Sequence, residues 1–440
     1  MKKLPHPGSL DTRYEGKGQA PIPGHNSAYP DRLFQVMNAT ALVDGSVLSY
    51  GHSYGDPERP VFVQLDSQGR FVSELGHVEV PSMYEPPALT FALNQFVELV
   101  HLGAAHEGDT LALSLPFQAA DDCIYSSLAI GRYTATLKPK KGFGDNGIQF
   151  VPHSSASDAP HGLKRAAPDV KPSRRARRQD FTYAITPLDL PRAALIDKTL
   201  KVIYRETASD TFGLVSASTY LAHFEADSGK LLECYRIVIK EQVPLLYDAA
   251  FLQDGRALLL GQVGNTAYLA RLTSAGVIDQ TFGTQGLVEL PDPGYLGLAT
   301  DGQRIVVTHA PPWQPAGYAS TVYQYTSEGQ FDPDFNCGTP LKVAPSAPAD
   351  TLRLYRAAFD GQGNIVLAGA QGKIDSGIKS SLCVVRLRAS GTLDTGFGDG
   401  GYALGPDGLI SGDGLYVHHD GIRLLTQAYN ADCYIVKRHV

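Results

Sequence analysis

The chain has 440 residues, of which 43% are hydrophobic, and its formal net charge is −7. The hydrophobic content is high enough for a sizeable core, which argues against a largely disordered chain. The negative charge argues against a protein that binds nucleic acid over a broad basic face. No apolar run approaches the roughly 18 residues that a membrane helix needs.

The content of aromatic and turn-forming residues indicates a β-rich protein. The chain contains 45 glycines, 29 prolines, 22 tyrosines and 17 phenylalanines, a composition that fits many strands joined by turns. Length alone would suggest two or three domains, but an array of repeats forms one large domain instead. We therefore expect one domain over residues 1–440 if the chain is a repeat array.

The cysteines and the N-terminus bear on the cellular location. The cysteines are odd in number, far apart and without C-x-x-C spacing, so we expect reduced thiols rather than disulfides or a zinc site. Lys2 and Lys3 are followed by no apolar stretch, which excludes a typical secretory signal. We expect a cytoplasmic protein, although export by a route that reads no N-terminal signal would be compatible with this sequence. The five cysteines are Cys123, Cys234, Cys337, Cys383 and Cys433.

The N-terminal residues 8–16 match one half of a repeat that recurs along the chain. The pattern is a Gly, a variable residue, an apolar residue, an Asp, two variable residues, and then Phe-Gly or a variant. Looser copies of the repeat follow at 61–69 and 133–147, and another lies at 220–229. A fixed internal pattern of this kind is the signature of a repeat architecture.

A second marker precedes each copy of the repeat. It is Asp-Gly or a variant, followed by an apolar strand, because this dipeptide favours tight turns. We expect the apolar strand to be buried on both faces and the next strand, which contains Leu269 and Arg271, to alternate between buried and exposed residues. The markers are Asp44-Gly45, Gly108-Asp109, Asp254-Gly255, Asp301-Gly302, Asp360-Gly361 and Asp420-Gly421, with Asp210 as the poorest.

Residues 152–180 interrupt the repeat. The segment lacks periodicity, is rich in Ser, Ala and Pro, and contains the basic cluster Arg174, Arg175, Arg177 and Arg178. We interpret it as a long basic flexible loop inserted between two blades. Three roles stay open: an insertion without a role, a docking site for nucleic-acid phosphates or an acidic partner, and a site of proteolytic processing.

The clearest copies of the repeat lie between residues 250 and 440. They span Gly276–Gly283, Gly329–Phe335 and Gly391–Gly398, each with an upstream Asp-Gly strand. A unit of about 50 to 60 residues holds roughly four strands of ordinary length. One such sheet cannot bury both of its faces, so the sheets must stack, and radial stacking gives a β-propeller.

This pattern resembles the delta-60 repeat family of bacterial β-propeller proteins. The three clear copies carry the resemblance, which is looser over 40–150 and weakest over 180–245. The resemblance implies a fold and implies almost nothing about activity, cofactors or site residues.

The two ends of the chain predict how the propeller is completed. Residues 434–438 match the strand that precedes the Gly-x-Leu-Asp half of the repeat, and residues 8–16 supply that half. We predict an all-β fold: a closed β-propeller of seven four-stranded blades, with the N-terminal strand completing the C-terminal blade. The third and fourth copies are weak, which leaves six or eight blades as alternatives.

No catalytic, cofactor-binding or metal-binding residue can be assigned from the sequence. One Asp per repeat supplies too few oxygen ligands for calcium, and turn closure is the expected role of that residue. His418 and His419 are adjacent, and residues adjacent on a strand point to opposite faces, so we do not expect them to share a ligand. No nucleophile elbow, Walker loop or dinucleotide fingerprint is present.

The sequence leaves three functions open. The first is a non-enzymatic recognition scaffold that binds a protein partner through the propeller face and its loops. Its candidate contacts are the four arginines and Trp313. The second is a carbohydrate- or small-ligand-binding propeller, suggested by aromatic loops at 50–54, 84–87 and 311–315. The third is a hydrolase or lyase with a site assembled from several blades. No cofactor and no membrane contact are expected, and nucleic acid is disfavoured.

Overall fold

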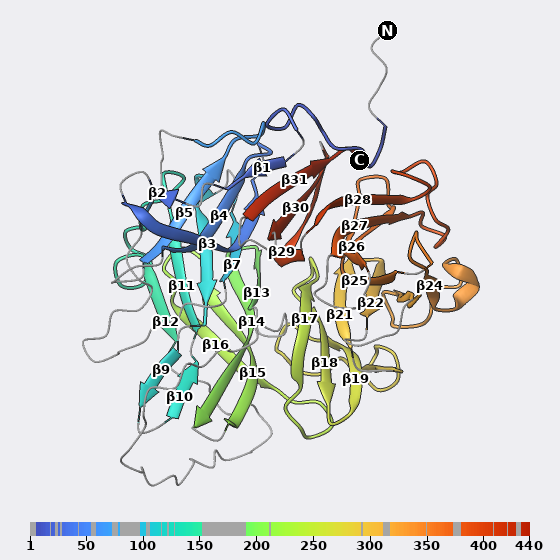
Figure 1. Cartoon of the computed structure of the whole chain (residues 1–440). Helices are drawn as coiled ribbons and strands as arrows, with labels where there is room; N and C mark the ends of the chain where they lie inside the picture. The colour runs from blue at the N-terminus through green and yellow to red at the C-terminus, as the bar shows by residue number, and fades with distance from the viewer. Residues whose placement is uncertain are drawn as a thin grey trace. The chain divides into compact units, whose positions relative to one another are not determined.

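The structure is a computed structural model with seven antiparallel sheets (Figure 1). The fold is that of an all-β, seven-bladed β-propeller, as the sequence predicts. The chain divides into two compact units: unit 1 is Met1–Glu79, Thr281–Thr284 and Asp292–Val440, and unit 2 is Val80–Gln280 and Gln285–Pro291. The residues described are 6–17, 19–22, 25–26, 29–42, 44–53, 59–72, 78–79, 97–102, 106–115, 117–120, 123–126, 128–151, 191–210, 213–291, 294–310, 317–348, 350–372, 380–407, 409–419, 421–427 and 433–440.

Unit 1 contains four sheets, which we number by chain order. Sheet 1 has the order β2-β3-β4-β5-β6, and its strands are β2 (His25–Asn26), β3 (Tyr29–Ala41), β4 (Val47–Ser53), β5 (Arg59–Leu65) and β6 (Val78–Glu79). Sheet 5 runs through β21 (Tyr295–Thr300), β22 (Arg304–Ala310), β23 (Ser320–Thr326) and β24 (Leu341–Val343). Sheet 6 runs through β25 (Thr351–Phe359), β26 (Ile365–Gly372), β27 (Ser380–Leu387) and β28 (Tyr402–Asp407).

Sheet 7 of unit 1 combines strands from both ends of the chain. Its order is β29-β30-β31-β1, with β29 (Leu409–His418), β30 (Gly421–Gln427), β31 (Cys433–Arg438) and β1 (Gln19–Pro21). β1 pairs antiparallel with β31, and a bridge joins Leu10 to Arg438. The N-terminal segment therefore supplies the fourth strand of this sheet. That the pairing closes the whole propeller stays a prediction.

Unit 2 contains three sheets. Sheet 2 has the order β7-β8-β11-β12, with β7 (Val97–His101), β8 (Thr110–Ser114), β11 (Leu128–Tyr133) and β12 (Ile148–Val151). Sheet 3 consists of β13 (Arg192–Ile196), β14 (Thr199–Asp210), β15 (Gly213–Glu225), β16 (Leu231–Ile237) and the hairpin β9 (Phe117–Ala120) and β10 (Cys123–Ser126). Sheet 4 runs through β17 (Leu245–Phe251), β18 (Ala257–Val263), β19 (Thr266–Leu272) and β20 (Leu287–Leu290).

The Asp-Gly markers precede apolar strands, as predicted, and each of these strands is the second of its sheet, counted from β3 in sheet 1. In sheet 6, Asp360 Oδ1 accepts hydrogen bonds from the backbone N–H groups of Gln362 and Asn364, both at 2.9 Å. The side chain thereby closes the turn that leads into β26, whose residues are buried over nearly the whole strand. Asp420 lies outside the described residues, although the following Gly421 begins β30.

The marker at Asp210 was wrong. Asp210 ends β14 and pairs with Gly213 in the β14–β15 hairpin, so it lies between the second and third strands of sheet 3. The turn before the second strand is at Asp197-Lys198, between β13 and β14. Asp197 has a φ of 56° and so adopts the left-handed conformation that glycine supplies elsewhere. Asp-Lys is not a typical turn dipeptide, so the sequence did not indicate this turn. The number of sheets is nevertheless seven, as predicted.

The prediction that the third strand alternates was also wrong. β19 is buried from Ala267 to Leu272, and the Arg271 side chain is only 1% exposed. Both faces of β19 are buried along most of the strand, and Arg271 Nε donates to Asp279 Oδ2 at 2.8 Å. A charged residue is tolerated at this buried position because it is paired and hydrogen-bonded.

A repeated contact, which we call the aromatic latch, joins a repeat turn to the following one at five places in the described part of the chain. In unit 1, the Phe335 ring packs against Gly391, whose φ is 84° and where a Cβ would lie 2.9 Å from the ring. A side chain at Gly391 is therefore excluded by both backbone conformation and space. Beside the ring, Asn336 N donates to Ser390 O at 2.9 Å. The aromatic residues of the five latches are Tyr14, Phe143, Phe282, Phe335 and Phe397, all at most 1% exposed.

The latch hydrogen bond recurs with the same geometry. Each donor follows the aromatic residue and has a positive φ, and each acceptor is the carbonyl that precedes the turn glycine. This explains why the repeat contains Phe-Gly and a Gly at fixed spacing. The pairs are Glu15 N to Gln68 O, Gly144 N to Ser228 O, Gly283 N to Glu328 O, Asn336 N to Ser390 O and Gly398 N to Pro7 O, with distances of 2.8, 2.8, 2.9, 2.9 and 2.7 Å.

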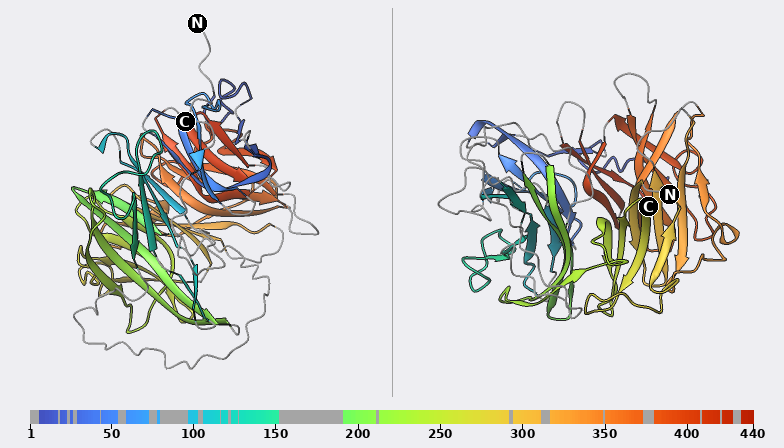
Figure 2. Two further views of the ribbon diagram at one scale, coloured as in Figure 1. Left: turned by 90° about the vertical axis from the view of Figure 1, so that its left-hand side faces the viewer. Right: turned by 90° about the horizontal axis from the view of Figure 1, so that it is seen from below.

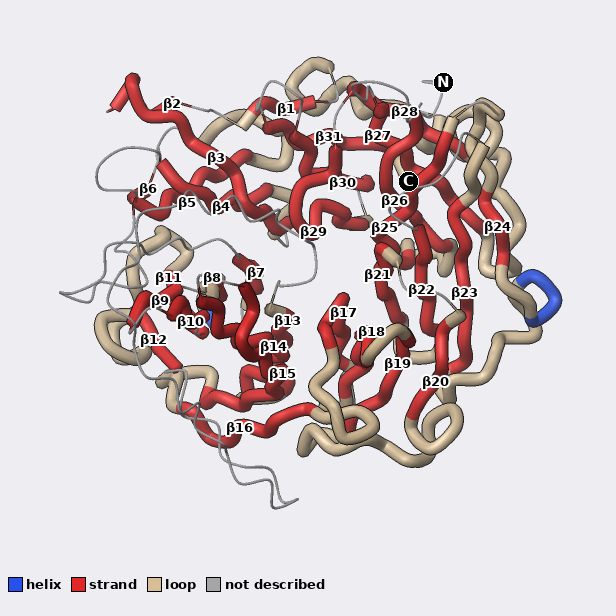
Figure 3. Tube along the Cα trace, turned by 60° about the horizontal axis from the view of Figure 1, so that its bottom comes forward, coloured by secondary structure: helices blue, strands red, loops and turns tan. Residues whose placement is uncertain are grey.

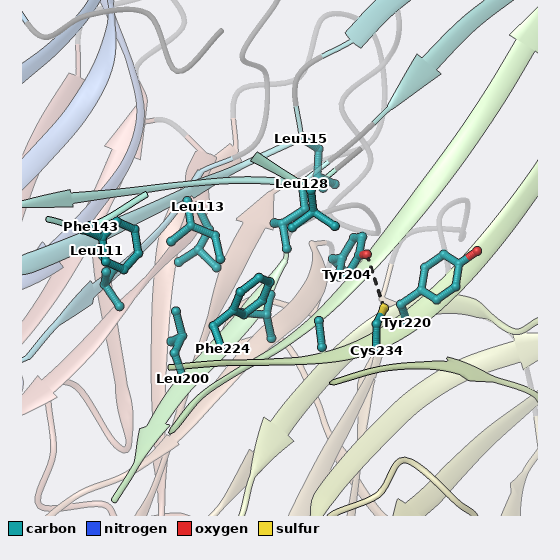
Figure 4. Close-up of a cluster of buried hydrophobic side chains, with 14 of the residues drawn as sticks. Leu111, Leu113, Leu115, Leu128, Phe143, Leu200, Tyr204, Tyr220, Phe224 and Cys234 are labelled. Atoms are coloured by element: carbon teal, nitrogen blue, oxygen red, sulfur yellow. Dashed lines mark hydrogen bonds between the residues drawn. The ribbon is translucent and has the colours of Figure 1, made fainter. Parts of the chain in front are cut away.

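The hydrophobic core lies between adjacent sheets. Figure 4 shows the cluster between sheets 2 and 3, where Leu111 and Leu113 face Leu200 and Phe224. Each fully buried side chain of this size contributes roughly 1.5–3 kcal/mol. No helix in the described part of the chain is long and apolar enough to cross a membrane.

Candidate functional site

The guessed partner contacts lie outside the described residues. These are the segment 152–180 with Arg174, Arg175, Arg177 and Arg178, and Trp313 with its neighbours 311–315. The aromatic segment 84–87 also falls outside. The position of the insertion between β12 and β13 is clear from the chain order. Its role, and that of Trp313, stays a prediction.

The aromatic loop expected at 50–54 is partly a strand. Tyr50 belongs to β4, is fully buried, and meets the Phe62 ring edge-on with a centroid distance of 5.0 Å. The exposed aromatic surface expected here was therefore wrong for Tyr50, because strand pairing extends to Ser53. Tyr54 lies outside the described residues.

The repeated aspartates close turns, as predicted. Asp394 Oδ1 accepts the Gly396 N–H at 3.3 Å, and Asp394 Oδ2 accepts Arg386 Nε at 2.8 Å. Burial raises the pKa of Asp394, but the hydrogen bond and charge of Arg386 outweigh it and hold the pKa below its ordinary value. Among the described residues, no group of three or more His, Cys, Asp and Glu side chains could hold a metal ion.

His418 and His419 lie closer together than strand geometry predicts. β29 ends at His418, and His419 is in the following turn, so the alternation of a strand does not separate them. Their ring centroids are 4.0 Å apart. Both side chains are at least partly exposed, which agrees with the expected turn with exposed histidines.

The third strands share an equivalent position, which we call the third-strand position. It is the residue paired with Leu48, Leu111, Lys201, Leu258, Val306, Val366 or Arg423 of the second strand. Most of its side chains bind a carboxylate: Arg132 binds Asp109 (2.8 Å), Arg271 binds Asp279 (2.8 Å), Gln324 binds Asp332 (2.7 Å), Arg386 binds Asp394 (2.8 Å) and Lys437 binds Asp11 (3.4 Å). In sheet 1 the position is Gln64, and in sheet 3 it is His223.

The first strands also share a position, which we call the first-strand position. It is the residue paired with Tyr50, Leu113, Ile203, Leu260, Thr308 or Ala368 of the second strand. Its occupants are Asn38, Glu98, Arg192, Asp248, Gly297 and Arg356. Unlike the residues of the turns, this position has a different side chain in almost every sheet. Repeat proteins build their binding surfaces from positions whose residues vary while the backbone stays the same.

In unit 2 the first-strand position forms a charged cluster. Strand β13 contacts β7 and β17 (Figure 3), which brings three charged side chains together. Arg192 Nε donates to Asp248 Oδ1 at 2.7 Å, and Arg192 Nη1 lies 3.6 Å from Glu98 Oε2. All three side chains are at most 18% exposed. Two carboxylates thus flank one guanidinium, and the cluster has a net charge of −1.

In unit 1 the first-strand position is less charged. Arg356 is 7% exposed, and its Nη1 donates to the Tyr355 carbonyl at 3.0 Å. A Cβ at Gly297 would lie 2.5 Å from the same carbonyl, so only glycine allows β21 to lie this close to β25. A bulge precedes Arg356, as one precedes Asp248 in unit 2.

Sheet 3 departs most from the repeat. β14 and β15 are 12 and 13 residues long, whereas the second and third strands of the other sheets have 5 to 8 residues. β13 pairs only with Thr199–Ile203, and β16 pairs only with Thr219–Phe224. The remaining part of the hairpin extends beyond these strands, and its twist is visible in Figure 2.

The extended part of the hairpin pairs with β10, which lies in the connection between β8 and β11 of sheet 2. β10 lies beside Ala208 and Ser209 of β14, and β9 pairs with β10 (Figure 1). On the other side, Gly213–Ser218 of β15 pair with no further strand among the described residues. This stretch of the edge reads Gly-Leu-Val-Ser-Ala-Ser and contains no charged residue and no proline.

The sequence reasoning missed the first-strand and third-strand positions. The signal was available for Arg271 and Arg386, which stand one residue before the end of the strand that precedes a clear repeat turn. It was weaker for Glu98, Arg192 and Asp248, because a bulge and the altered turn at Asp197 change their spacing from the markers. The long β14–β15 hairpin was hidden by the false marker at Asp210.

Three free cysteines are described. Cys234 and Cys383 are buried and Cys337 is exposed. Tyr204 lies beside Cys234, with the phenol oxygen 3.8 Å from the sulfur (Figure 4). Burial raises the pKa of the Cys234 thiol to about 11, so this residue stays a neutral core thiol near neutral pH.

Comparisons with known proteins agree with the fold and leave the function open. A family model described as a domain of unknown function, DUF5122, beta-propeller, matches residues 363–397, from the turn before β26 to the latch residue Phe397. This match supports a β-propeller family. No curated protein matches the chain.

Several solved structures resemble the chain at low identity. Polysaccharide lyase Uly1 is 12% identical, with 95% of this chain and 90% of that chain covered and a TM-score of 0.49. The GH93 α-L-arabinofuranosidase of Fusarium graminearum is 13% identical, with 85% and 98% covered and a TM-score of 0.44. The β-propeller domain of the Trilobed protease from Pyrococcus furiosus is 7% identical, with 92% and 95% covered and a TM-score of 0.42. Similarities at this level assign no activity.

Proposed function

We propose that the protein is a non-enzymatic recognition scaffold that binds a protein partner at the extended end of the β14–β15 hairpin. The observation that carries this proposal is the uncharged edge Gly213–Ser218 of β15. A strand edge presents unpaired N–H and C=O groups, which an extended segment of another protein can bind by adding a strand. Membership of the delta-60 repeat family and a cytoplasmic location are part of the proposal.

The other outer strands support this reading by contrast. Strands β16, β20, β24 and β28 each contain a charged residue, namely Glu233, Glu289, Lys342 and Asp407. Charges on an edge strand discourage the addition of a further strand. The edge of β15 has no such residue over the six residues from Gly213 to Ser218, a property it shares with the shorter outer strand β12 (Ile148–Val151).

The basic insertion supplies a second predicted contact. Segment 152–180 follows β12 and precedes β13, so it enters the chain directly before sheet 3. Its arginines Arg174, Arg175, Arg177 and Arg178 would attract an acidic partner, and Trp313 is kept as a further guessed contact. The partner that we expect is therefore a protein with an extended, uncharged strand next to an acidic region.

The test is an affinity pull-down from the native host, read by mass spectrometry. The wild type is compared with Val215→Lys, which places a charge on the edge, and with a variant lacking 154–179. Val277→Lys is the matched control, because Val277 is an exposed valine in a turn of sheet 4. We expect a partner that binds the wild type and V277K, is lost with V215K, and is weakened by the deletion. Equal capture by V215K and the wild type would exclude the edge, and size-exclusion chromatography of the purified protein would reveal self-association instead.

A second candidate function is the binding of a small polar ligand, including a carbohydrate, at the first-strand position. The cluster of Glu98, Arg192 and Asp248 favours it, because a few fixed polar groups determine how such a ligand is oriented. Glycan-array binding that is lost in the variant E98Q/R192Q/D248N, which removes the three charges, would support this function. The same loss in R386Q/D394N, a buried pair outside that position, would show a general loss of structure. A hydrolase or lyase at this position stays the third proposal, to be tested by product release from the bound glycans.

A further inference from the structure

The contact between sheet 3 and sheet 4 differs from the latched contacts. Both sheets belong to unit 2. Gly276 stands where a latch would place its glycine, but a Cβ there would meet the Tyr235 Cβ and a Leu221 methyl, at 3.0 and 3.4 Å, instead of a turn phenylalanine. No latch hydrogen bond to the carbonyl of residue 275 exists among the described residues. Polar contacts along the strands take its place.

One of these contacts is made by a buried lysine. Lys201 is 7% exposed, and its Nζ donates to the Gly255 carbonyl of sheet 4 at 2.8 Å. The described part of the chain shows no carboxylate within ion-pair distance of Lys201, although Glu233 and Asp254 act on it from further away. Burial lowers the pKa of Lys201 as the largest effect. This ammonium group is therefore sensitive to any further positive charge nearby.

His223 lies directly beside this lysine. Lys201, His223 and Glu233 are cross-strand partners on β14, β15 and β16, which places them in one row on the same face of the sheet. His223 Nδ1 lies 3.1 Å from Glu233 Oε2, while the buried Nε2 has no hydrogen-bond partner among the described residues. With Nδ1–H bonded to the carboxylate, Nε2 is the atom that takes up a proton.

The surroundings of His223 favour the neutral imidazole. Burial lowers the pKa of His223, the charge of Lys201 lowers it further, and Glu233 opposes both. Glu233 is 56% exposed, so water weakens its effect, and it also shares its carboxylate with the Tyr235 hydroxyl. Asp254 of sheet 4 acts on the charge of Lys201 from a distance, but its carboxylate already accepts a hydrogen bond from Arg256 Nε at 2.7 Å. Among the described residues, the exposed Glu233 is the one carboxylate in contact with His223, so a second buried positive charge beside Lys201 is compensated only weakly.

We propose that the contact between sheets 3 and 4 is an acid-sensitive joint, in which protonation of His223 Nε2 displaces Lys201 from Gly255. A protonated His223 would bury an N–H without an acceptor and a positive charge beside Lys201. Moving the flexible lysine away from the Gly255 carbonyl relieves this repulsion. The opposite end of the contact is held by Arg192–Asp248 and by Thr219 Oγ1, which donates to Pro244 O at 3.0 Å. Loosening is thus confined to the end near Gly255.

The pH range follows from the sign of the effect. The folded protein holds the pKa of His223 below the 6.5 of an ordinary histidine. Above that value His223 is neutral in the folded and unfolded chains, and the joint is intact. As the pH falls below it, the unfolded chain binds the proton more readily, and the joint weakens progressively.

Hydrogen exchange read by mass spectrometry tests the joint. Exchange of the 251–263 region is measured at about pH 7.5 and about pH 5, after correction for intrinsic rates, and we expect protection to fall about tenfold at the lower pH. His223→Gln keeps a donor for Glu233 but cannot be charged, so it should abolish this change. The turn at Gly302, which contains no histidine, is the internal control. An equal loss of protection in the wild type and H223Q would overturn the proposal.

A second measurement guards against a variant that does not fold. The pKa of His223 is measured by NMR on protein with labelled histidine, in the wild type and in Lys201→Met. We expect a value below 6.5 in the wild type and a higher value in K201M, because the neighbouring positive charge is gone. A value that K201M leaves unchanged would show that Lys201 and His223 are not coupled, and the joint would then be excluded.

Discussion

Sheet 6 and sheet 3 have the same strand register but different chemistry at the third-strand position. In sheet 6, Arg386 is 6% exposed, binds Asp394 of the repeat turn, and lies 4.7 Å from the centre of the Phe397 ring. In sheet 3, His223 occupies the position, and its carboxylate partner, Glu233, comes from the fourth strand and is 56% exposed. The pairing of the backbone is therefore the same in both sheets, while the residue type and its carboxylate partner differ.

The change of chemistry coincides with a change in how the sheet meets its neighbour. The turn after β27 contains Asp394 and the latch residue Phe397, so one short segment serves both the ion pair and the latch. Sheet 3 lacks this turn, and there the polar row with Lys201 makes the contact instead. Sheet 6 thus contacts both of its neighbours in unit 1 through latched turns, whereas sheet 3 has a latched turn toward sheet 2 and polar strand contacts toward sheet 4.

The largest effect is expected for the latch that enters sheet 6. Phe335→Ala removes a ring that is 1% exposed and leaves a cavity beside Gly391. Because a buried phenylalanine is truncated, the free energy of unfolding should fall by about 3–5 kcal/mol. Phe331→Ala, at a side chain that is 45% exposed, is the control and should cost less than about 1 kcal/mol. Denaturant unfolding checks both, and equal losses would show that the latch does not hold the sheet.

The next effect concerns the ion pair of sheet 6. Asp394→Asn removes the carboxylate that binds Arg386 at 2.8 Å and leaves the more distant Asp360, at 3.8 Å, as the remaining partner, which should lower the free energy of unfolding by about 3 kcal/mol at neutral pH. The folded protein lowers the pKa of Asp394, so its stabilisation is present above about 3.8, the ordinary value, and is lost as the pH falls below it. The difference between D394N and the wild type should therefore shrink in acid. A constant difference from pH 7 to about pH 3 would contradict the role of the charge.

The sequence predicted sheet 6 better than sheet 3 for a physical reason. The turns of sheet 6 need Asp360 for its side-chain hydrogen bonds and Gly391 for its positive φ, and few other residues serve. The corresponding first turn of sheet 3 is the shorter Asp197-Lys198, in which a non-glycine residue takes the positive φ and which has no turn signature. Strand length gave no warning either, since the extended hairpin depends on pairing with β10, which is distant in sequence.

The same difference applies to the candidate site. The repeat pattern could identify the aspartates, because their role is local to one turn. Glu98, Arg192 and Asp248 come from three sheets and are brought together only by the packing of β7, β13 and β17. Their spacing along the chain carries no motif, and bulges shift it further. Long-range packing of this kind is invisible to a single sequence.

A smaller effect separates backbone strain from packing at the latch. Gly391→Ala and Gly302→Ala both place alanine at a positive φ, 84° and 90°. At Gly391 the new methyl group would lie 2.9 Å from the Phe335 ring, whereas nothing lies within 4 Å at Gly302. We expect a loss of about 1 kcal/mol for G302A and a further 1–2 kcal/mol for G391A. Denaturant unfolding measures the difference, and equal losses would mean that the ring moves aside without cost.

The smallest effect on stability is expected in sheet 3. Glu233→Gln alters an exposed carboxylate, and exposed ion pairs contribute about 0–1 kcal/mol, so unfolding at neutral pH should change little. The pKa of His223 should nevertheless fall, because Glu233 is the group that raises it against burial and Lys201. NMR titration of the labelled histidine measures this shift, with Glu289→Gln, on the outer strand of sheet 4, as the control. If E233Q left the pKa of His223 unchanged, the carboxylate of Glu233 would have no electrostatic effect on the histidine. The contact of Lys201 with Gly255 would then be the only interaction of the polar row that contributes to the joint.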